Sequence, residues 1–281
     1  MREISADKIK NTVKELFLKA NYYISSDILN AIKEGINREE SETGRDVLKQ
    51  IIKNNEIAAT KKIAICQDTG LAILFIKMGQ DVHIVDGDFN KAINDGVREA
   101  YGKGCLRKSA VTDPLYDRIN TKDNTPAIIH LEIVPGDKIH IEVTAKGFGS
   151  ENMSALKMLS PSDGEKGVKD FIVETIRKAG PNPCPPVILG IGIGGSIEKA
   201  AQIAKKATLR EIGKQNPDPR YAKLEKELLE DINNLGIGPA GLGGRVTALA
   251  VNIDWIPAHI ASLPVVVNVC CHAARHAEAK I

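Results

Sequence analysis

The sequence predicts a mixed α/β protein, with helices packed around mixed β-sheet, at least one antiparallel hairpin and an N-terminal helical segment. Helical periodicity dominates residues 1–60, and β-rich runs bounded by glycine and proline interleave with helices after that. The interleaving is irregular, which favours a mixed fold over a regular doubly wound sheet. The chain has 281 residues, 43% of them hydrophobic, so it can bury a large core, and we expect one domain over 1–281.

The first 60 residues are the predicted helical lead-in. Ser5 is placed to cap a helix whose apolar positions, from Ile9 to Ala20, recur at helical spacing. Ser26 and Ser41 open two further helical patterns. None of the three helices shows a motif with recognisable chemistry, so we expect function to reside in residues 61–281.

Strand patterns begin after this lead-in. A short strand over 63–65 is predicted to end at Cys66, and an apolar strand over 72–78 follows the next turn. The β-rich runs 125–134 and 138–145 flank a Pro-Gly-Asp turn, which predicts a hairpin between them.

Further helices and strands follow the same patterns. Helices are predicted at 88–101, 165–178, 197–209 and 220–235, and strands at 187–193, 246–253 and 264–269. Two loops carry polar residues beside glycine. The loop 102–109 is basic, and the glycines of loop 146–154 let backbone N–H groups approach an anion, although a plain turn after a strand fits that loop equally well.

The charge distribution points to a small-molecule partner. Lysine plus arginine number 38 and aspartate plus glutamate 36, and the positive charges are spread along the chain. No basic stripe indicates nucleic acid. The N-terminal residues show neither the apolar core of a signal peptide nor a run long enough to span a membrane. We therefore expect a cytoplasmic protein.

The five cysteines are an odd number without an export signal, which argues against a disulfide framework and leaves metal binding open. Cys66, Cys184 and Cys271 lie far apart in the chain, so a zinc site built from close ligand pairs is disfavoured. One local zinc alternative places His272 and His276 on one face of a terminal helix with a neighbouring cysteine. A buried apolar role is the other alternative for any one cysteine.

A glycine motif offers a different function. Gly190, Gly192 and Gly195 satisfy the G-x-G-x-x-G spacing of dinucleotide-binding proteins. The first glycines fall inside an apolar run rather than after it, and no second strand ending in an acidic residue follows. A dinucleotide-binding protein is the alternative of another class.

Six segments stand in order between about residue 60 and the C-terminus: Cys66-Gln67-Asp68-Thr69-Gly70, Leu106-Arg107-Lys108-Ser109, Lys146 to Ser154, Cys184-Pro185-Pro186, Pro257-Ala258-His259 and Cys271 to Ile281. Together they resemble the α subunit of class I, iron-sulfur fumarate hydratases and tartrate dehydratases. The resemblance implies a hydro-lyase that reversibly hydrates fumarate to (S)-malate. Tartrate, or another 2-hydroxydicarboxylate, is the alternative substrate.

The resemblance implies that Cys66, Cys184 and Cys271 ligate a [4Fe-4S] cluster whose fourth iron has no protein ligand. Cys270 is the alternative to Cys271, and Cys105 matches no cluster position. An open iron acts as a Lewis acid that binds a substrate carboxylate and hydroxyl and lowers the cost of expelling hydroxide. We expect such an enzyme to be sensitive to oxygen.

By the same resemblance, the substrate pocket is lined by Gln67, Asp68, Arg107, His259 and a glycine of the 146–150 loop. Arg107 suits a bidentate grip on a carboxylate of the small dicarboxylate substrate. Asp68 or His259 can orient the hydroxyl or relay a proton. Gly147 and Gly149 both offer a backbone N–H, and the choice between them stays open.

The resemblance also implies a partner. In fused members of the family a second domain follows and supplies basic residues and the residue expected to abstract the proton, whereas this chain ends at Ile281. We therefore expect a separate β subunit to complete the active site, in an assembly such as α2β2. Part of the preference between fumarate and tartrate is expected to reside in that subunit.

Overall fold

The computed structural model describes residues 1–281, which form two compact units of mixed α/β structure. Unit 1 comprises Met1–Ser25, Asn54–Phe148 and Arg275–Ile281, and unit 2 comprises Ser26–Lys53 and Gly149–Ala274. The mixed α/β class is confirmed, and the single domain over 1–281 stays a prediction. No helix combines the length and the apolar character needed to cross a bilayer.

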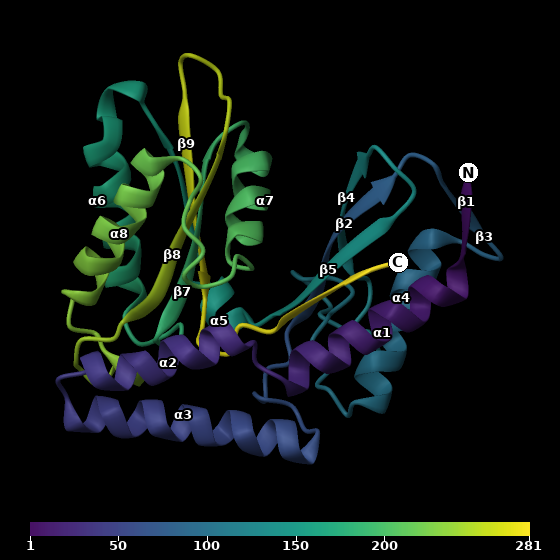
Figure 1. The fold of residues 1–281 in the computed structure, drawn as a ribbon, viewed down its shortest axis with the longest axis horizontal. Helices are drawn as coiled ribbons and strands as arrows, with labels where there is room; N and C mark the ends of the chain where they lie inside the picture. The colour runs from purple at the N-terminus through teal and green to yellow at the C-terminus, as the bar shows by residue number, and fades with distance from the viewer. The chain divides into compact units, whose positions relative to one another are not determined.

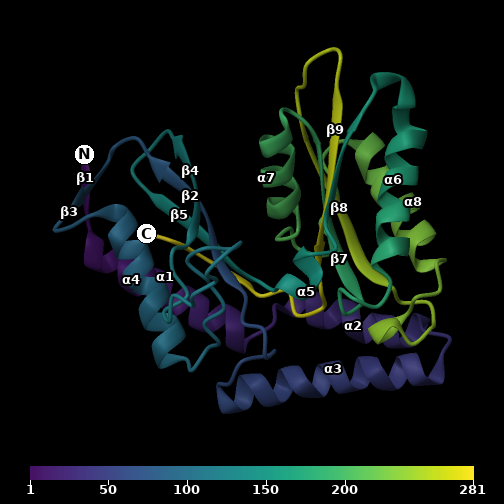
Figure 2. The same cartoon turned by 180° about the vertical axis from the view of Figure 1, so that it is seen from behind.

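Unit 1 is built on a four-stranded sheet in the order β10-β5-β2-β4, with a separate parallel pair, β1-β3. Its elements are β1 (Arg2–Ser5), α1 (Ala6–Tyr22), β2 (Leu71–Gly79), β3 (Val82–Val85), α4 (Phe89–Lys103), β4 (Ile128–Val134), β5 (Ile139–Lys146) and β10 (His276–Lys280). Ser5 caps α1 as predicted, accepting a hydrogen bond from the Lys8 N–H. Helices α1 and α4 pack together against the sheet and close the core over residues such as Leu74 and Ile141 (Figure 2).

The two β-rich runs predicted as a hairpin form β4 and β5, but they are not neighbours. Strand β2 lies between them, parallel to β4 and antiparallel to β5. The intervening Pro-Gly-Asp turn bends over the end of β2, where a Cβ on Gly79 would lie 2.2 Å from the carbonyl oxygen of Gly136. The hairpin prediction is therefore wrong, because turn chemistry shows that the chain reverses but not which strand fills the space between its arms.

Residues 62–70 form an irregular loop, so the predicted strand over 63–65 is wrong. The Ile65 N–H donates to the carbonyl oxygen of Asn21 at 2.9 Å, and the Asn54 side-chain amide donates to the carbonyl oxygen of Ile65 at 2.8 Å. The N–H and the carbonyl oxygen of Ile65 thus have hydrogen-bond partners although the residue belongs to no sheet. Within the apolar run, Ile65 is buried, with 6% of its surface exposed, whereas Ile63 is 48% exposed.

Helix α4 anchors the end of this loop through Tyr101. The buried Tyr101 hydroxyl donates to the carbonyl oxygens of Thr69 at 2.8 Å and Gly70 at 2.9 Å. Burial raises the pKa of Tyr101 far above its ordinary value; the positive charge of Arg275 opposes this rise and the Asp68 carboxylate adds to it. The hydroxyl therefore remains a donor, and α4 fixes the point at which the loop enters β2.

Unit 2 carries a second four-stranded sheet in the order β6-β9-β7-β8. Its elements are α2 (Ser26–Arg38), α3 (Glu42–Lys61, through Lys53), the short α5 (Phe148–Glu151, from Gly149), β6 (Ala155–Leu159), α6 (Gly164–Ala179), β7 (Val187–Gly194), α7 (Ile197–Ala207), α8 (Pro219–Asn233), β8 (Ala248–Ile256) and β9 (Leu263–Cys270), with 3-10 turns at Pro161–Asp163 and Pro239–Gly241. Figure 1 shows α7 on one face of this sheet and α6 and α8 on the other, so both faces are covered.

The glycines of the G-x-G-x-x-G pattern serve helix packing. Gly190 and Gly192 lie inside β7, where a Cβ would come within 2.0 Å of the carbonyl oxygen of Ala204 and 2.1 Å of that of Ala200. Their missing side chains let α7 lie directly on β7. The motif thus marks close helix–strand contact, which removes the sequence support for dinucleotide binding.

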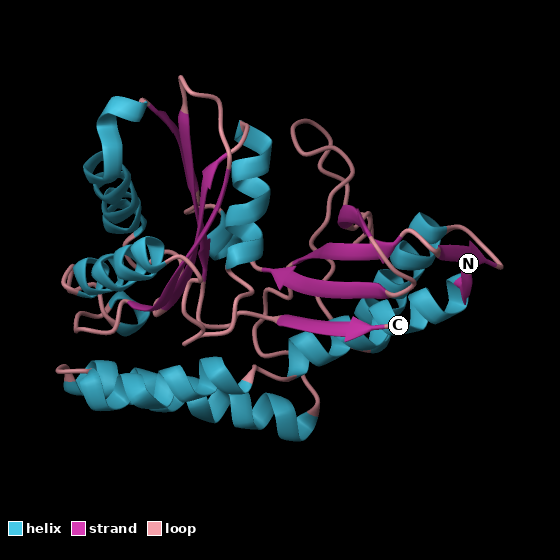
Figure 3. Ribbon diagram, turned by 45° about the horizontal axis from the view of Figure 1, so that its top comes forward, coloured by secondary structure: helices cyan, strands magenta, loops and turns pink.

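The C-terminal residues form strand β10, not a helix (Figure 3). β10 pairs antiparallel with β5; its Ala277 is buried in the core and Ala279 packs against that core, while Glu278 and Lys280 are exposed. His276 is the first residue of this strand, so it does not share a helix face with His272. The zinc alternative built on such a face is wrong, because the ending has the alternating pattern of a strand.

Removal of the Tyr101 hydroxyl tests the anchoring of the loop. Tyr101→Phe keeps the ring but removes the hydroxyl donor to the carbonyl oxygens of Thr69 and Gly70, of which that of Gly70 keeps the Asn124 side-chain amide. We expect it to cost about 1–3 kcal/mol of unfolding free energy. A thermal melt should show a midpoint several degrees below that of the parent protein. Tyr116→Phe is the control, because Tyr116 is 82% exposed and its change should leave the midpoint in place. Equal midpoints for the two variants would contradict the anchoring role.

Candidate functional site

Asp68 links two loops of unit 1. Its Oδ1 accepts a hydrogen bond from the Gly70 N–H at 2.9 Å, and its Oδ2 accepts one from the Phe148 N–H at 2.8 Å. One donor belongs to its own loop, and the other to the loop that follows β5. Both carboxylate oxygens are therefore oriented by backbone groups, which fixes the side chain more firmly than a contact with a flexible side chain would.

Gly147 lies directly beside this carboxylate. A Cβ on Gly147 would lie 3.3 Å from Asp68 Oδ2 and 2.9 Å from Arg275 Nη2. Gly149 is different, because a Cβ there would meet only the carbonyl oxygen of Asn182, at 3.8 Å. Crowding by polar groups thus explains the glycine at 147, and Gly147 is the one of the two that adjoins Asp68.

Arg275 lies buried beneath both loops, with 2% of its surface exposed. Its Nε donates to the carbonyl oxygen of Ala145 at 3.1 Å, and its Nη1 donates to the carbonyl oxygen of Asp68. The guanidinium therefore ties the end of β5 to the loop that carries Asp68. No role for Arg275 was predicted from the sequence, where its signal is a charged residue directly after the small apolar pair Ala273 and Ala274.

The other predicted residues of unit 1 lie beside Asp68 in sequence, apart from Arg107, which comes from a different loop. The Cys66 thiol donates to Gln67 Oε1 at 3.3 Å. The Thr69 hydroxyl donates to the carbonyl oxygen of Arg107 at 3.0 Å, while the Arg107 side chain is exposed. Unit 1 therefore brings Cys66, Gln67, Asp68 and Gly147 together with the backbone of Arg107.

Unit 2 contains Gly149, the two other predicted cysteine ligands and His259. Cys184 is exposed and has a φ of 56°, a left-handed conformation that a non-glycine residue adopts only when its surroundings hold it there. Cys271 follows β9 and is half-buried, whereas Cys270 is buried as the last residue of that strand.

His259 lies in the exposed connection between β8 and β9. Its Nδ1 accepts a hydrogen bond from the Ala261 N–H at 3.2 Å. In the neutral ring this contact places the proton on Nε2. The ring therefore presents a donor nitrogen away from its own backbone, as a residue that relays a proton requires.

The cysteines meet the chemical requirements of an iron-sulfur ligand set. None of the five is in a disulfide, and Cys66, Cys184 and Cys271 lie in loops with part of their surface accessible. Iron-sulfur clusters are held by thiolates, which must be unoxidised and reachable. The residues therefore fit the group that the sequence implies.

A second group of ligand-type side chains lies on the sheet of unit 1. His140, Glu142 and Glu278 place one ligand atom each within 4.8 Å of the others, and His140 Nε2 lies 2.8 Å from Glu278 Oε2. The group contains no thiol. It therefore lacks the thiolate ligands that hold an iron-sulfur cluster, and we do not assign the cluster to it.

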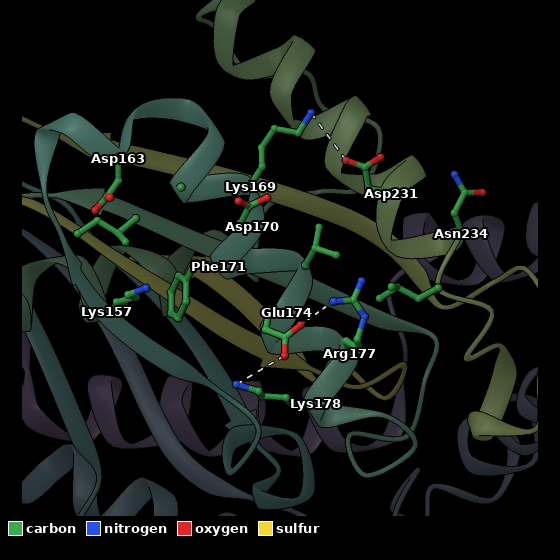
Figure 4. Close-up of a pocket in the computed structure, with 14 residues that line it drawn as sticks. Lys157, Asp163, Lys169, Asp170, Phe171, Glu174, Arg177, Lys178, Asp231 and Asn234 are labelled. Carbon is green, nitrogen blue, oxygen red and sulfur yellow. Dashed lines mark hydrogen bonds and ion pairs between the residues drawn. The ribbon is translucent and has the colours of Figure 1, made fainter.

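A groove of about 1000 Å³ on unit 2 contains none of the predicted site residues (Figure 4). Five of its eight charged side chains pair with one another: Lys169 with Asp231 at 3.7 Å, and Glu174 with Arg177 at 2.6 Å and with Lys178 at 3.6 Å. Opposite charges that already compensate each other give little net field for an anionic substrate. The groove is therefore not the candidate catalytic site.

Comparison with known proteins identifies the class to which this fold and these loops belong. A family model described as "Fumarate hydratase (Fumerase)" matches residues 10–280. The chain belongs to the fumarate hydratase (Fumerase) family.

Curated relatives are similar over nearly their whole length. The chain is 46% identical to the "Putative L(+)-tartrate dehydratase subunit alpha" of Methanocaldococcus jannaschii, over 98% of each chain. It is 34% identical to the "L(+)-tartrate dehydratase subunit alpha" of Escherichia coli strain K12 and to that of Shigella sonnei, over 98% of this chain and 92% of each relative. The expected family is thereby confirmed.

Arg275→Lys tests whether the buried guanidinium holds the two loops. A lysine ammonium cannot reproduce the planar fork that reaches both carbonyl oxygens, so the Asp68 loop should loosen. We expect faster hydrogen exchange at the Gly70 and Phe148 amides, which donate to Asp68, measured by mass spectrometry. Arg38→Lys is the control, since the Arg38 side chain is exposed. Unchanged exchange at both amides in Arg275→Lys would refute the role.

Proposed function

We propose that this chain is the α subunit of a hydro-lyase that removes water from a four-carbon 2-hydroxydicarboxylate and adds it back. The match over residues 10–280 carries the proposal, since it includes both loops that meet at Asp68. The names of the relatives, all dehydratase α subunits, support the same reaction class. We propose that residues 1–281 form one catalytic domain and that the enzyme is located in the cytoplasm.

Cys66, Cys184 and Cys271 would hold a [4Fe-4S] cluster. Accessibility supports Cys271 over Cys270, because Cys270 is buried at the end of β9 with 6% of its surface exposed. When bound, the cluster supplies an iron with an open coordination position, a Lewis acid for the substrate hydroxyl. Oxidation of such an iron accounts for the oxygen sensitivity that the proposal includes.

The chain's own residues bind and orient the substrate. Asp68, with both oxygens positioned by backbone donors, orients the hydroxyl or relays its proton, and the Gly147 backbone lines the substrate site beside that carboxylate. The Arg107 guanidinium grips a substrate carboxylate, with Gln67 as a further hydrogen-bonding group. His259 is the second proton relay, through Nε2.

Two substrates compete for this site. Fumarate and (S)-malate follow from the description of the family, whereas the names of the curated relatives favour L(+)-tartrate. Tartrate carries one more hydroxyl than malate, and a site built to hydrogen-bond that hydroxyl rejects malate much more strongly than a site for malate rejects tartrate. We therefore propose malate and L(+)-tartrate as the two candidate substrates, and a comparison of their reaction rates decides between them.

A β subunit completes the site in this proposal, in an assembly such as α2β2. The names of the relatives, which call them subunits alpha, support a second chain. Since Asp68 is held by two hydrogen bonds, we assign it orientation or proton relay and assign abstraction of the C–H proton to the β subunit.

Anaerobic purification with and without a β-type partner tests the function. The chain alone should bind four irons and four sulfides but show little activity. With the partner, dehydration of malate and of L(+)-tartrate should appear, and the ratio of the two kcat/KM values assigns the substrate. Exposure to air should abolish activity and bleach the brown absorbance. A chain without iron or sulfide, or full activity from this chain alone, would reject the proposal.

The two glycines provide a matched test of the substrate site. Gly147→Ala places a methyl group against Asp68 and Arg275, and a shift of such groups by about 1 Å can cost about 100-fold in kcat/KM. Gly149→Ala should stay within about twofold of the parent, because its methyl group makes only ordinary contact. Gly102→Ala, with nothing within 4 Å, is the neutral control. A loss in Gly149→Ala but not in Gly147→Ala would reverse the assignment.

A further inference from the structure

Glu39 lies in unit 2 between α2 and α3, and it is a buried carboxylate that binds the backbone. It is 3% exposed; its Oε1 accepts from the N–H groups of Ser41 at 2.9 Å and Arg245 at 2.8 Å, and its Oε2 accepts from that of Val246 at 2.7 Å. Burial acts to raise the pKa of Glu39, but these backbone donors outweigh it and hold the pKa below its ordinary value. Glu39 therefore stays charged and bound to residues 245 and 246.

Two glycines leave the space that this carboxylate occupies. A Cβ on Gly244 would lie 2.3 Å from Glu39 Oε1, and a Cβ on Gly44 would lie 2.9 Å from Glu39 Cδ. Gly244 also has a φ of +121°, which other residues rarely adopt. The chain is thus built around Glu39 from two sides, which a solvated surface carboxylate would not require.

The segment held by Glu39 is the end of a glycine-rich loop, residues 236–246, which is braced internally. The Gly243 N–H donates to the carbonyl oxygen of Ile237 at 2.9 Å, and the Gly241 N–H donates to that of Gly238 at 3.0 Å. A Cβ on Gly238 would lie 2.1 Å from the carbonyl oxygen of Gly243. Because the loop folds back on itself so closely, fixing its end fixes its tip.

The tip of the glycine-rich loop packs on the segment that carries Cys184. The Ala240 N–H donates to the carbonyl oxygen of Pro185 at 2.8 Å, and a Cβ on Gly241 would lie 2.2 Å from the Cβ of Pro181. Cys184 lies between these two contacts, and its own N–H donates to the carbonyl oxygen of Pro181 at 3.1 Å. Ala240 and Cys184 both have left-handed φ values, 53° and 56°, which only a firm surrounding maintains.

We propose that Glu39 is a positioning residue for Cys184: it fixes the glycine-rich loop, and this loop sets the conformation of the segment from Pro181 to Pro185. The inference rests on the proposed function, in which Cys184 is a cluster ligand. It also gives the helical lead-in a role, since α2 and α3 deliver Glu39 to the loop.

Glu39→Gln tests this assignment. The amide has one acceptor oxygen in place of two and turns an NH2 group toward backbone donors. The hydrogen bonds that fix the end of the glycine-rich loop should therefore weaken. In the anaerobic apo-protein, we expect alkylation of Cys184 by iodoacetamide to speed up several-fold relative to Cys66, measured by peptide mass spectrometry. In the iron-loaded protein, cluster iron should be lost to a chelator several times faster than from the parent.

Glu40→Gln is the matched control, because the neighbouring Glu40 is exposed, and it should behave as the parent in both measurements. If Glu39→Gln does not fold, Glu39→Asp, which keeps the charge on a shorter side chain, takes its place. A lowered melting temperature with unchanged Cys184 alkylation would show that Glu39 is only structural and would overturn the proposal. A parent protein without iron would instead reject the proposed function, while the alkylation rates would still decide the role of Glu39.

Discussion

The carboxylate of Asp68 is the point on which the candidate site of unit 1 depends. Its two oxygens accept backbone hydrogen bonds from Gly70 and Phe148, and Arg275 binds its carbonyl oxygen from below. Two loops distant in sequence are therefore fixed to one side chain, and neither can shift without breaking a charge-assisted hydrogen bond. The orientation of the carboxylate is set by the fold before any substrate arrives, which is the condition for efficient positioning.

Arg275 and Glu39 solve the same physical problem with opposite charges. Each is almost fully buried, where an uncompensated charge is costly, and each is compensated by backbone dipoles. Arg275 binds two carbonyl oxygens, and Glu39 accepts from backbone N–H groups. A charge that binds backbone groups specifies the path of a loop, because those groups keep their direction only while the loop keeps its conformation. Buried charges of this kind are therefore suited to hold irregular segments that no helix or sheet can order.

The sequence predicted local features well and long-range partners poorly. The cap at Ser5 and the core strand β2 depend on neighbouring residues, and both were predicted correctly. The strand order around β2 and the pairing of β10 with β5 depend on residues distant in the chain. The turn signal therefore predicted a hairpin that does not form, and two histidines four apart suggested a terminal helix where the chain forms a strand. The segments near Cys66 and Cys184 were found by family resemblance, whereas Arg275 and Glu39 were missed because their partners are backbone atoms, which leave no pattern in the sequence.

The glycines show why a motif must be judged by its surroundings. A glycine is required wherever a Cβ would strike something, and the sequence does not say what that is. At Gly190 and Gly192 it is the backbone of α7, so the residues serve packing; at Gly147 it is a guanidinium nitrogen and a carboxylate oxygen. The Gly147 backbone therefore lies in a charged, polar setting, whereas Gly190 and Gly192 lie in a contact between a strand and a helix. The surroundings of Gly147 therefore favour a functional role for the K-G-F-G run at 146–149. Those of Gly190 and Gly192 indicate a packing role for the G-x-G-x-x-G run.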